Sequence, residues 1–147
     1  MNPRVWKLAA VLATGAAFIV LLAACGHADF TAAATPDMAK AAAAAGATVT
    51  ASGEGANRYP GGTGATWYQV ARSAEADGEA GGVLVGVLTF DSAAARNGAY
   101  RQIQFRSNRL PATVVYTWGN AVVQMTRFDD WGLLQDLATA MEDAGAR

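Results

Sequence analysis

Residues 112–127 read ATVVYTWGNAVVQMTR, and this stretch decides the fold. Two runs rich in β-branched residues, 112–118 and 121–127, flank the dipeptide Gly119-Asn120. Such a pair of runs around Gly-Asn is typical of a tight β-hairpin, because both residues tolerate the left-handed backbone that the turn needs. The chain is therefore predicted to contain antiparallel sheet.

Upstream of this hairpin, three further segments favour strands. Val83–Phe90 (VLVGVLTF) is a continuous apolar run, which is typical of a central strand buried on both faces. Ala65–Ser73 alternates in polarity, and Thr48–Ser52 has β-propensity. A Gly/Pro-rich loop, Gly53–Gly64, and a turn region, Ala74–Gly82, are predicted to connect them.

Three helices complete the pattern. The first is predicted from Thr35 as N-cap, with Pro36 at its first position, to a stop at Gly46. The second begins at Asp91 or Ser92 and ends near Phe105, and the third follows Asp129-Asp130. The third has one apolar face, made of Leu133, Leu134, Leu137, Ala138, Met141 and Ala144. The order α-β-β-β-α-β-β-α predicts an α+β fold with an antiparallel or mixed sheet of about five strands covered by helices.

Composition limits the possible functions. The 147 residues are only 16% charged and carry a net charge of −1, whereas a nucleic-acid-binding domain is normally strongly basic. The single Cys and single His cannot form an internal disulfide or a Cys/His zinc cluster. We expect no nucleic-acid partner, no metal site and no cofactor.

The N-terminus carries a targeting pattern. Arg4 and Lys7 precede the uncharged run Leu8–Ala24, which ends in Leu22-Ala23-Ala24-Cys25. This ending resembles the lipobox of bacterial lipoproteins, a family in which the Cys thiol receives a diacylglycerol and the chain is cut just before that Cys. The resemblance covers only the first 25 residues and implies nothing about the fold of the rest.

The resemblance implies a domain plan for the whole chain. Residues 1–24 are the lipoprotein signal peptide and are removed, residues 25–35 are the lipidated Cys and a tether, and residues 36–147 are one small α+β domain. Cys25 then attaches the protein by its lipid to the extracytoplasmic face of a cell membrane or outer membrane. The alternative is an uncleaved signal anchor with a passive Cys, and it also places 26–147 outside the cytoplasm. His27, which lies in the tether, is expected to be solvated spacer.

Three common catalytic or ligand motifs are absent from the sequence. No Ser lies in a G-x-S-x-G frame. The acids Glu75, Asp77 and Glu79 are not followed by the Gly and Glu of a calcium loop, so a solvated turn is favoured. The glycines of Gly53–Gly64 lack the G-K-[ST] of a phosphate loop, so a surface loop is favoured.

A few side chains remain as candidates for binding. Trp118 lies beside the hairpin turn, where burial is hardest to complete, and Trp is enriched at interface hot spots. The alternative, which the composition of small-domain cores favours, is that Trp118 folds back over the sheet and caps the core. Tyr59 and Arg58, in the Gly-rich loop, are also candidates for partner contact. The basic stretch Arg96–Arg109 favours a solvated helix and loop over an anion-binding patch. The other aromatic residues are expected in the core, namely Trp67, Tyr68, Tyr100, Tyr116 and Trp131.

These features favour a lipid-anchored, non-enzymatic binding module of the bacterial cell envelope, with an envelope protein or a glycan as its partner. One alternative is a small-molecule or glycan binder, which requires an aromatic-lined pocket. A second is an envelope enzyme that uses carboxylates alone, such as Asp91 with Asp129 or Asp130. Facing carboxylates across a cleft would favour that enzyme, and a sheet with neither feature leaves the interaction module.

Overall fold

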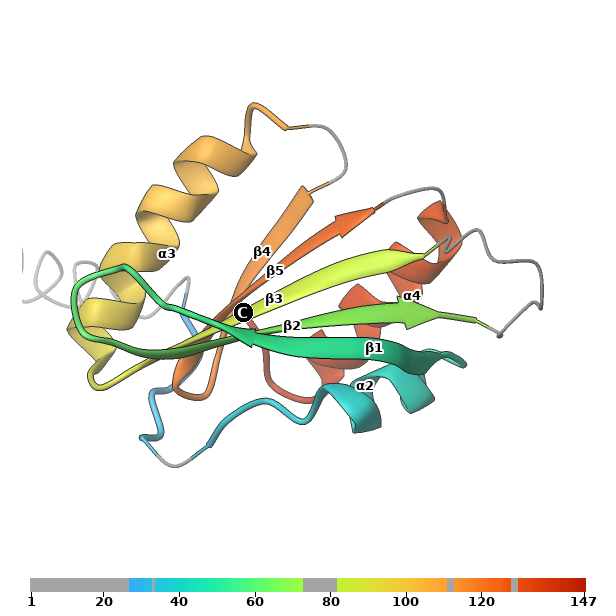
Figure 1. The fold of residues 1–147 in the computed structure, drawn as a ribbon, viewed down its shortest axis with the longest axis horizontal. Coiled ribbons are helices and arrows are strands. Elements are labelled where there is room, and N and C mark those ends of the chain that lie inside the picture. The colour runs from blue at the N-terminus through green and yellow to red at the C-terminus, as the bar shows by residue number, and fades with distance from the viewer. Residues whose placement is uncertain (1–26, 33, 73–81, 111–112, 128–129) are drawn as a thin grey trace, which may run out of the picture.

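The computed structural model describes residues 27–32, 34–72, 82–110, 113–127 and 130–147 (Figure 1). Within these residues, five strands form one antiparallel sheet in the order β1-β2-β3-β5-β4, with three helices packed on it. The element bounds are α2 Met38–Ala44, β1 Thr48–Gly55, β2 Gly62–Ala71, β3 Val83–Phe90, α3 Ala93–Ser107, β4 Thr113–Trp118, β5 Ala121–Arg127 and α4 Trp131–Asp143. The predicted α+β class and element order are confirmed.

The predicted hairpin and central strand are confirmed nearly residue for residue. β4 and β5 pair from Trp118 opposite Ala121, and Gly119 takes the positive φ of +57° that the tight turn requires. β3 lies in the middle of the sheet between β2 and β5. The expectation that it is buried on both faces is wrong, because Leu84 is 37% exposed on the face that α3 does not cover.

Several element boundaries differ from the sequence prediction, and among them β2 ends at Ala71 rather than Ser73 and α3 ends at Ser107 rather than near Phe105. The predicted loop Gly53–Gly64 shrinks to residues 56–61, because Gly53 and Gly55 of β1 pair with Trp67 and Ala65 of β2. Pairing with a neighbouring strand overrides the low β-propensity of glycine there. The first helix begins later than predicted, since its N-cap is Asp37, whose carboxylate accepts a hydrogen bond from the Lys40 amide at 3.0 Å.

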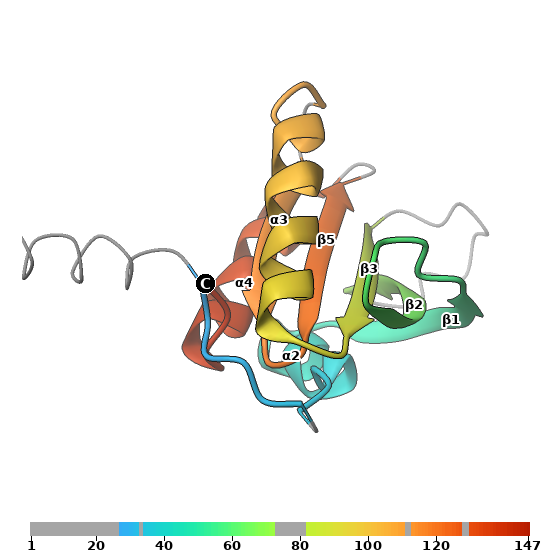
Figure 2. The ribbon, with the colours of Figure 1, turned by 90° about the vertical axis from the view of Figure 1, so that its left-hand side faces the viewer.

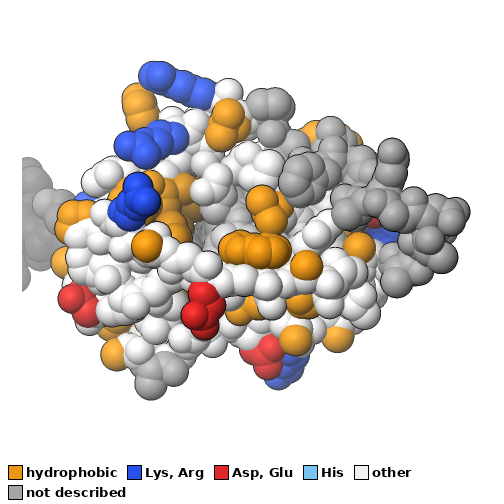
Figure 3. Space-filling model, viewed as in Figure 1, with side chains coloured by type: hydrophobic (Ala, Val, Ile, Leu, Met, Phe, Trp, Pro, Cys, Tyr) orange, Lys and Arg blue, Asp and Glu red, His pale blue; other side chains and the backbone are white. Residues whose placement is uncertain are grey.

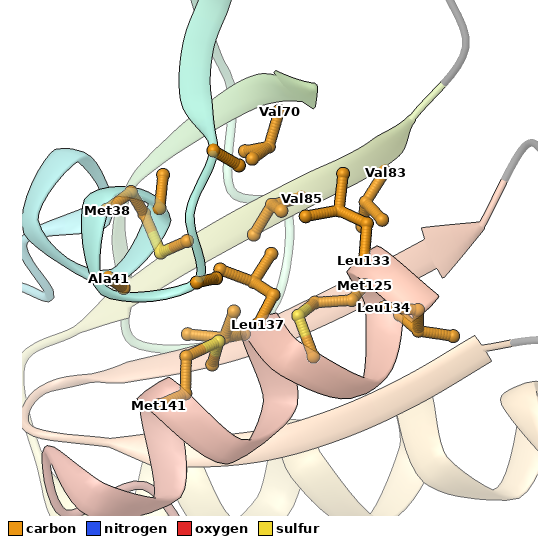
Figure 4. Packing of buried hydrophobic residues seen from close by; sticks show 14 of the residues in the cluster. Met38, Ala41, Val70, Val83, Val85, Met125, Leu133, Leu134, Leu137 and Met141 are labelled. Atoms are coloured by element: carbon orange, nitrogen blue, oxygen red, sulfur yellow. The ribbon is translucent and has the colours of Figure 1, made fainter. Parts of the chain in front are cut away.

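The main core lies between the sheet and the pair α2 and α4. Side chains alternate along a strand, so Val83, Val85 and Val87 of β3 share the face toward these helices, and all three are buried. In Figure 4, Leu133, Leu137 and Met141 of α4 point toward Val85 and Met125. The apolar face predicted for the last helix is thereby confirmed except at Ala144, which is the exposed C-cap of α4.

The opposite face of the sheet carries α3, which packs mainly on β4 and β5. Ala99 and Ile103 of α3 form a second buried cluster with Phe90 and Val122. Phe105 is 63% exposed, as its place off the apolar arc predicts. Figure 2 shows α3 over the β5 side of the sheet, while β1 and β2 extend beyond it. One face of the β1–β2–β3 half is therefore left open.

Residues 27–34, which the sequence analysis assigns to a tether, lie against the domain in their described part. Ala28 is 8% exposed, and its amide donates a hydrogen bond of 2.8 Å to the hydroxyl of Thr117 in β4. His27 is half-buried, and its ring meets the edge of Tyr100 with centroids 5.0 Å apart. The expectation that His27 is solvated spacer is wrong, because a neighbouring element supplies packing that the local sequence does not reveal.

Candidate functional site

The open face of the sheet is centred on Trp67. In the strand register, Trp67 lies opposite Gly53 of β1 and Gly86 of β3. A Cβ placed on Gly53 would come within 2.6 Å of the Trp67 indole, so the indole lies across the backbone of β1. Even so, 42% of Trp67 is exposed. Gly53 therefore leaves room for the indole to lie on the β1 backbone, and the outer side of the ring stays exposed.

The surroundings of Trp67 on this face are apolar or uncharged. Leu84, which is diagonal to Trp67 across β2 and β3, is 37% exposed. Gln69 lies opposite Leu84, and Gln124 lies opposite Gly86, so both amides share the face. Figure 3 shows hydrophobic side chains gathered over the strands beside α3, with basic side chains along that helix. We call Trp67, Leu84, Gln69 and Gln124 the open-face cluster.

The expectation that Trp67 and Trp131 belong to the core is wrong. Trp131, the first residue of α4, is 52% exposed. The prediction fails for Trp67 because helix α3 covers only one half of its sheet face. Tyr68, Tyr116 and Trp118 are half-buried and pack against the main core, and Tyr100 packs against the second cluster.

The basic stretch Arg96–Arg109 divides into two kinds of residue. Arg101, Arg106 and Arg109 are exposed, and the Arg109 guanidinium lies 4.9 Å from the centre of the Phe105 ring. Arg96 is only 1% exposed. Of the four, Arg96 thus cannot belong to a surface patch.

Arg96 instead binds the N-terminal segment to the hairpin turn. Its guanidinium donates to the carbonyls of Ala28 at 2.5 Å, Asp29 at 3.4 Å and Gly119 at 2.6 Å. Its Nε donates to the Asn97 side chain at 3.0 Å, and the cation lies 5.5 Å from the centre of the Phe30 ring. Burial lowers the pKa of Arg96, and the charge of Asp29 opposes that shift. A buried cation held by carbonyls fixes the segment in place.

A pocket of about 450 Å³ opens at this end of the domain. It is bordered by the N-terminal segment, the hairpin turn and the C-terminal residues, namely His27, Ala28, Asp29, Thr31, Ala34, Trp118, Gly119, Ala144, Gly145 and Arg147. Trp118 is the one Trp or Tyr in this lining. The aromatic-lined pocket required by the small-molecule alternative is therefore not seen here.

Trp118, the leading candidate from sequence, packs against the main core as well as lining the pocket. We expect Trp118→Ala to lower the free energy of unfolding by about 1.5–3 kcal/mol, less than the 3–5 typical of a fully buried Trp. Urea denaturation of the chain without residues 1–24 measures this change in the free energy of unfolding. An unchanged stability with loss of a co-purified partner would instead assign Trp118 to binding.

The two loop candidates differ in their settings. Tyr59 is half-buried against the second core cluster, and its carbonyl accepts a bond from the Gly62 amide at 2.9 Å. Arg58 is exposed in the short loop between β1 and β2. Both lie near the N-terminal end of α3, since Gly61 abuts Ala95 and Asp91. The structure does not bring them together with Trp118.

The carboxylates proposed for the enzyme alternative do not meet. Asp91 follows the last residue of β3, while Asp130 follows β5 beyond the opposite end of that strand, because Val83 pairs with Arg127. The length of β3 separates the two, about 25 Å at 3.3 Å per residue.

Asp130 caps α4 and forms an ion pair of 3.3 Å with Arg72, which also binds Asp136. Asp129 and the acids Glu75, Asp77 and Glu79 lie outside the described residues.

The residues that the structure describes hold neither a metal-binding cluster nor a membrane-spanning helix. No cluster of three His, Cys, Asp or Glu side chains there is arranged to hold a metal ion. Among the helices of that same part of the chain, none has the length and apolarity needed to cross a bilayer.

Sequence reasoning missed the open-face cluster and the role of Arg96. Trp67 was visible as an aromatic residue in a strand, but its exposure depends on which strands α3 covers. Arg96 was visible only as one of several basic residues on a predicted helix. Comparisons with protein-family models, curated proteins and solved structures find no match for this chain.

Proposed function

We propose that the protein is a lipid-anchored, extracytoplasmic, non-enzymatic binding module of the bacterial cell envelope, and that its partner binds the open-face cluster. The main support for this binding surface is the exposure of Trp67, which remains 42% exposed while its ring lies over Gly53. The lipobox-like run Leu22-Ala23-Ala24-Cys25 supports the anchor.

The open-face cluster has the properties of an interface centre. Trp is enriched among residues that contribute most to protein–protein affinity, and charged residues are depleted there. Trp67 and Leu84 form an apolar pair, and the flanking Gln69 and Gln124 are uncharged. A rigid indole on a sheet also loses little conformational entropy when a partner covers it.

A glycan is a second candidate partner. The flat exposed side of the Trp67 indole offers an apolar platform, and Gln69 and Gln124 add amides that can donate and accept hydrogen bonds. Binding sites for small polar ligands combine such an aromatic surface with a few placed polar groups. This arrangement supports stacking of one sugar ring on Trp67.

The proposal is tested by comparing Trp67→Ala with Trp131→Ala in the full-length lipidated protein. Both residues are exposed, at 42% and 52%, but Trp131 lies on α4, outside the open-face cluster. After cross-linking in native membranes, we expect the partner to be lost in Trp67→Ala and retained in Trp131→Ala. Retention in both variants would contradict the assignment of this surface.

The free energy of unfolding of Trp67→Ala must be measured together with its partner binding, because the Trp67 ring also covers Gly53 of the edge strand β1. Cross-strand pairs of this kind contribute about 0.2–1 kcal/mol. We expect Trp67→Ala to lose no more than about 1 kcal/mol, so the variant stays folded. Isolated envelope polysaccharide, added to wild type and to Trp67→Ala, tests the glycan: a Trp67-dependent fluorescence change indicates sugar binding.

A further inference from the structure

We propose that residues 27–32 and 34 form a clamp that holds the domain directly on the phospholipid surface, with the β4 edge toward the bilayer and the β1 edge away from it. The inference rests on the proposed lipidation of Cys25. It adds to that proposal a fixed orientation in place of a free tether, and it names the bilayer as the partner of the surface around His27.

The clamp is built from contacts at both of its ends. Near His27, the Ala28 amide binds the Thr117 hydroxyl, and the carbonyls of Ala28 and Asp29 bind the buried Arg96. Near Ala34, the Asn120 amide donates to the Ala34 carbonyl at 3.0 Å, and the Asn120 side chain donates to the Ala32 carbonyl at 3.1 Å. The segment is therefore bonded to β4, α3 and the hairpin turn.

The N-terminal segment packs closely against the β4–β5 turn at Gly119. A Cβ placed on Gly119 would lie 2.1 Å from the Ala34 carbonyl oxygen, so the chain crosses the turn at a point where only glycine fits. Thr117 also joins the C-terminal residues to this site, because its backbone exchanges hydrogen bonds of 2.6 and 2.9 Å with Arg147. Both ends of the described chain meet at the β4 edge (Figure 2).

The covalent chain then limits how far the domain can move from its anchor. Cys25 precedes His27 by two residues, which span at most about 7 Å even when fully extended. A lipid on Cys25 therefore keeps the His27 end of the domain at the headgroups. A free tether of residues 25–35 would have allowed several times that distance.

The strand order fixes what faces away from the membrane. β4 and β1 are the two edges of the sheet, and four inter-strand spacings separate them, about 19 Å. Figure 2 shows β1 and β2 on the side opposite the start of the described chain. The open-face cluster on β2 and β3 is thus held clear of the bilayer, within reach of a partner in the envelope.

The test places one fluorophore at either edge of the lipidated full-length protein. Cys25 is the only cysteine and its thiol is consumed by the lipid, so an introduced cysteine is the sole free thiol. Ala144→Cys, exposed beside the pocket that His27 lines, labels the near end, and Glu54→Cys, exposed on β1, labels the far end. The protein is reconstituted in phosphatidylcholine vesicles that contain a headgroup-nitroxide phosphatidylcholine, a short-range quencher.

We expect the probe at position 144 to be quenched at least twofold more than the probe at position 54. Inserting a 20-residue Gly/Ser linker between Gly26 and His27 leaves every clamp contact intact and is expected to abolish that difference. Equal quenching at both positions without the linker overturns the clamp, while co-flotation with the vesicles still supports the anchor. Failure to float, with an unmodified Cys25, overturns the anchor itself and the clamp with it.

Discussion

Replacing Cys25 with Ala is expected to abolish lipid attachment, the largest single effect predicted for this chain. Acyl chains contribute about 0.8 kcal/mol per buried CH₂, and two or three chains hold a protein on a membrane almost permanently. Without the thiol there is no acceptor for the diacylglycerol. The variant should incorporate no labelled palmitate, and it should either be released from membranes or keep residues 1–24.

Thr14→Ala provides the control for this substitution. It changes the one polar side chain of the run Leu8–Ala24 and leaves the Leu22-Ala23-Ala24-Cys25 sequence unchanged. We expect wild-type palmitate incorporation and wild-type processing. If Cys25→Ala incorporated as much palmitate as Thr14→Ala, the lipid would have to be on another residue.

Leu137→Ala is expected to lower the free energy of unfolding by about 2–5 kcal/mol. Leu137 is 0% exposed and packs in the main core between α4 and the sheet (Figure 4). Removing its branched end leaves a cavity that the neighbouring strands and helices cannot fully close. Urea denaturation of the chain without residues 1–24 measures this loss directly.

Thr139→Ala on the same helix is the matched control. Thr139 is exposed, and its hydroxyl only donates to the Gln135 carbonyl one turn earlier, at 3.0 Å. Substitution at such a surface position normally changes stability by no more than about 0.5 kcal/mol. Similar losses in both variants would show that the buried face of α4 has been assigned to the wrong side.

The elements that sequence predicted best are those whose local signals agree with their tertiary surroundings. β3 is predicted correctly because Val83, Val85 and Val87 face the main core, and the hairpin turn needs the positive φ that Gly119 supplies. The ends of β1 and β2 were missed because glycines at 53, 55, 62 and 64 favour a loop when considered alone. Their pairing with neighbouring strands, Gly53 and Gly55 with β2 and Gly62 and Gly64 with β3, makes them part of the sheet.

The candidate site was harder to predict because it depends on contacts between distant segments. The Arg96 guanidinium donates a hydrogen bond to the Ala28 carbonyl, 68 positions earlier in the sequence, and no local sequence pattern predicts that bond. The exposure of Trp67 follows from the placement of α3 over β4 and β5, which a linear sequence does not state. The segment 27–34 has the composition of a spacer, and its packing comes from Thr117, Asn120 and Arg96.

The lipid anchor is the claim on which both the cellular location and the clamp depend. Its most direct test is mass spectrometry of the N-terminal peptide of the protein purified from its own membranes. We predict a chain that begins at Cys25 and carries a diacylglyceryl group on that residue. A chain that begins at Met1 with an unmodified Cys25 would contradict the anchor, and with it the orientation proposed for the domain.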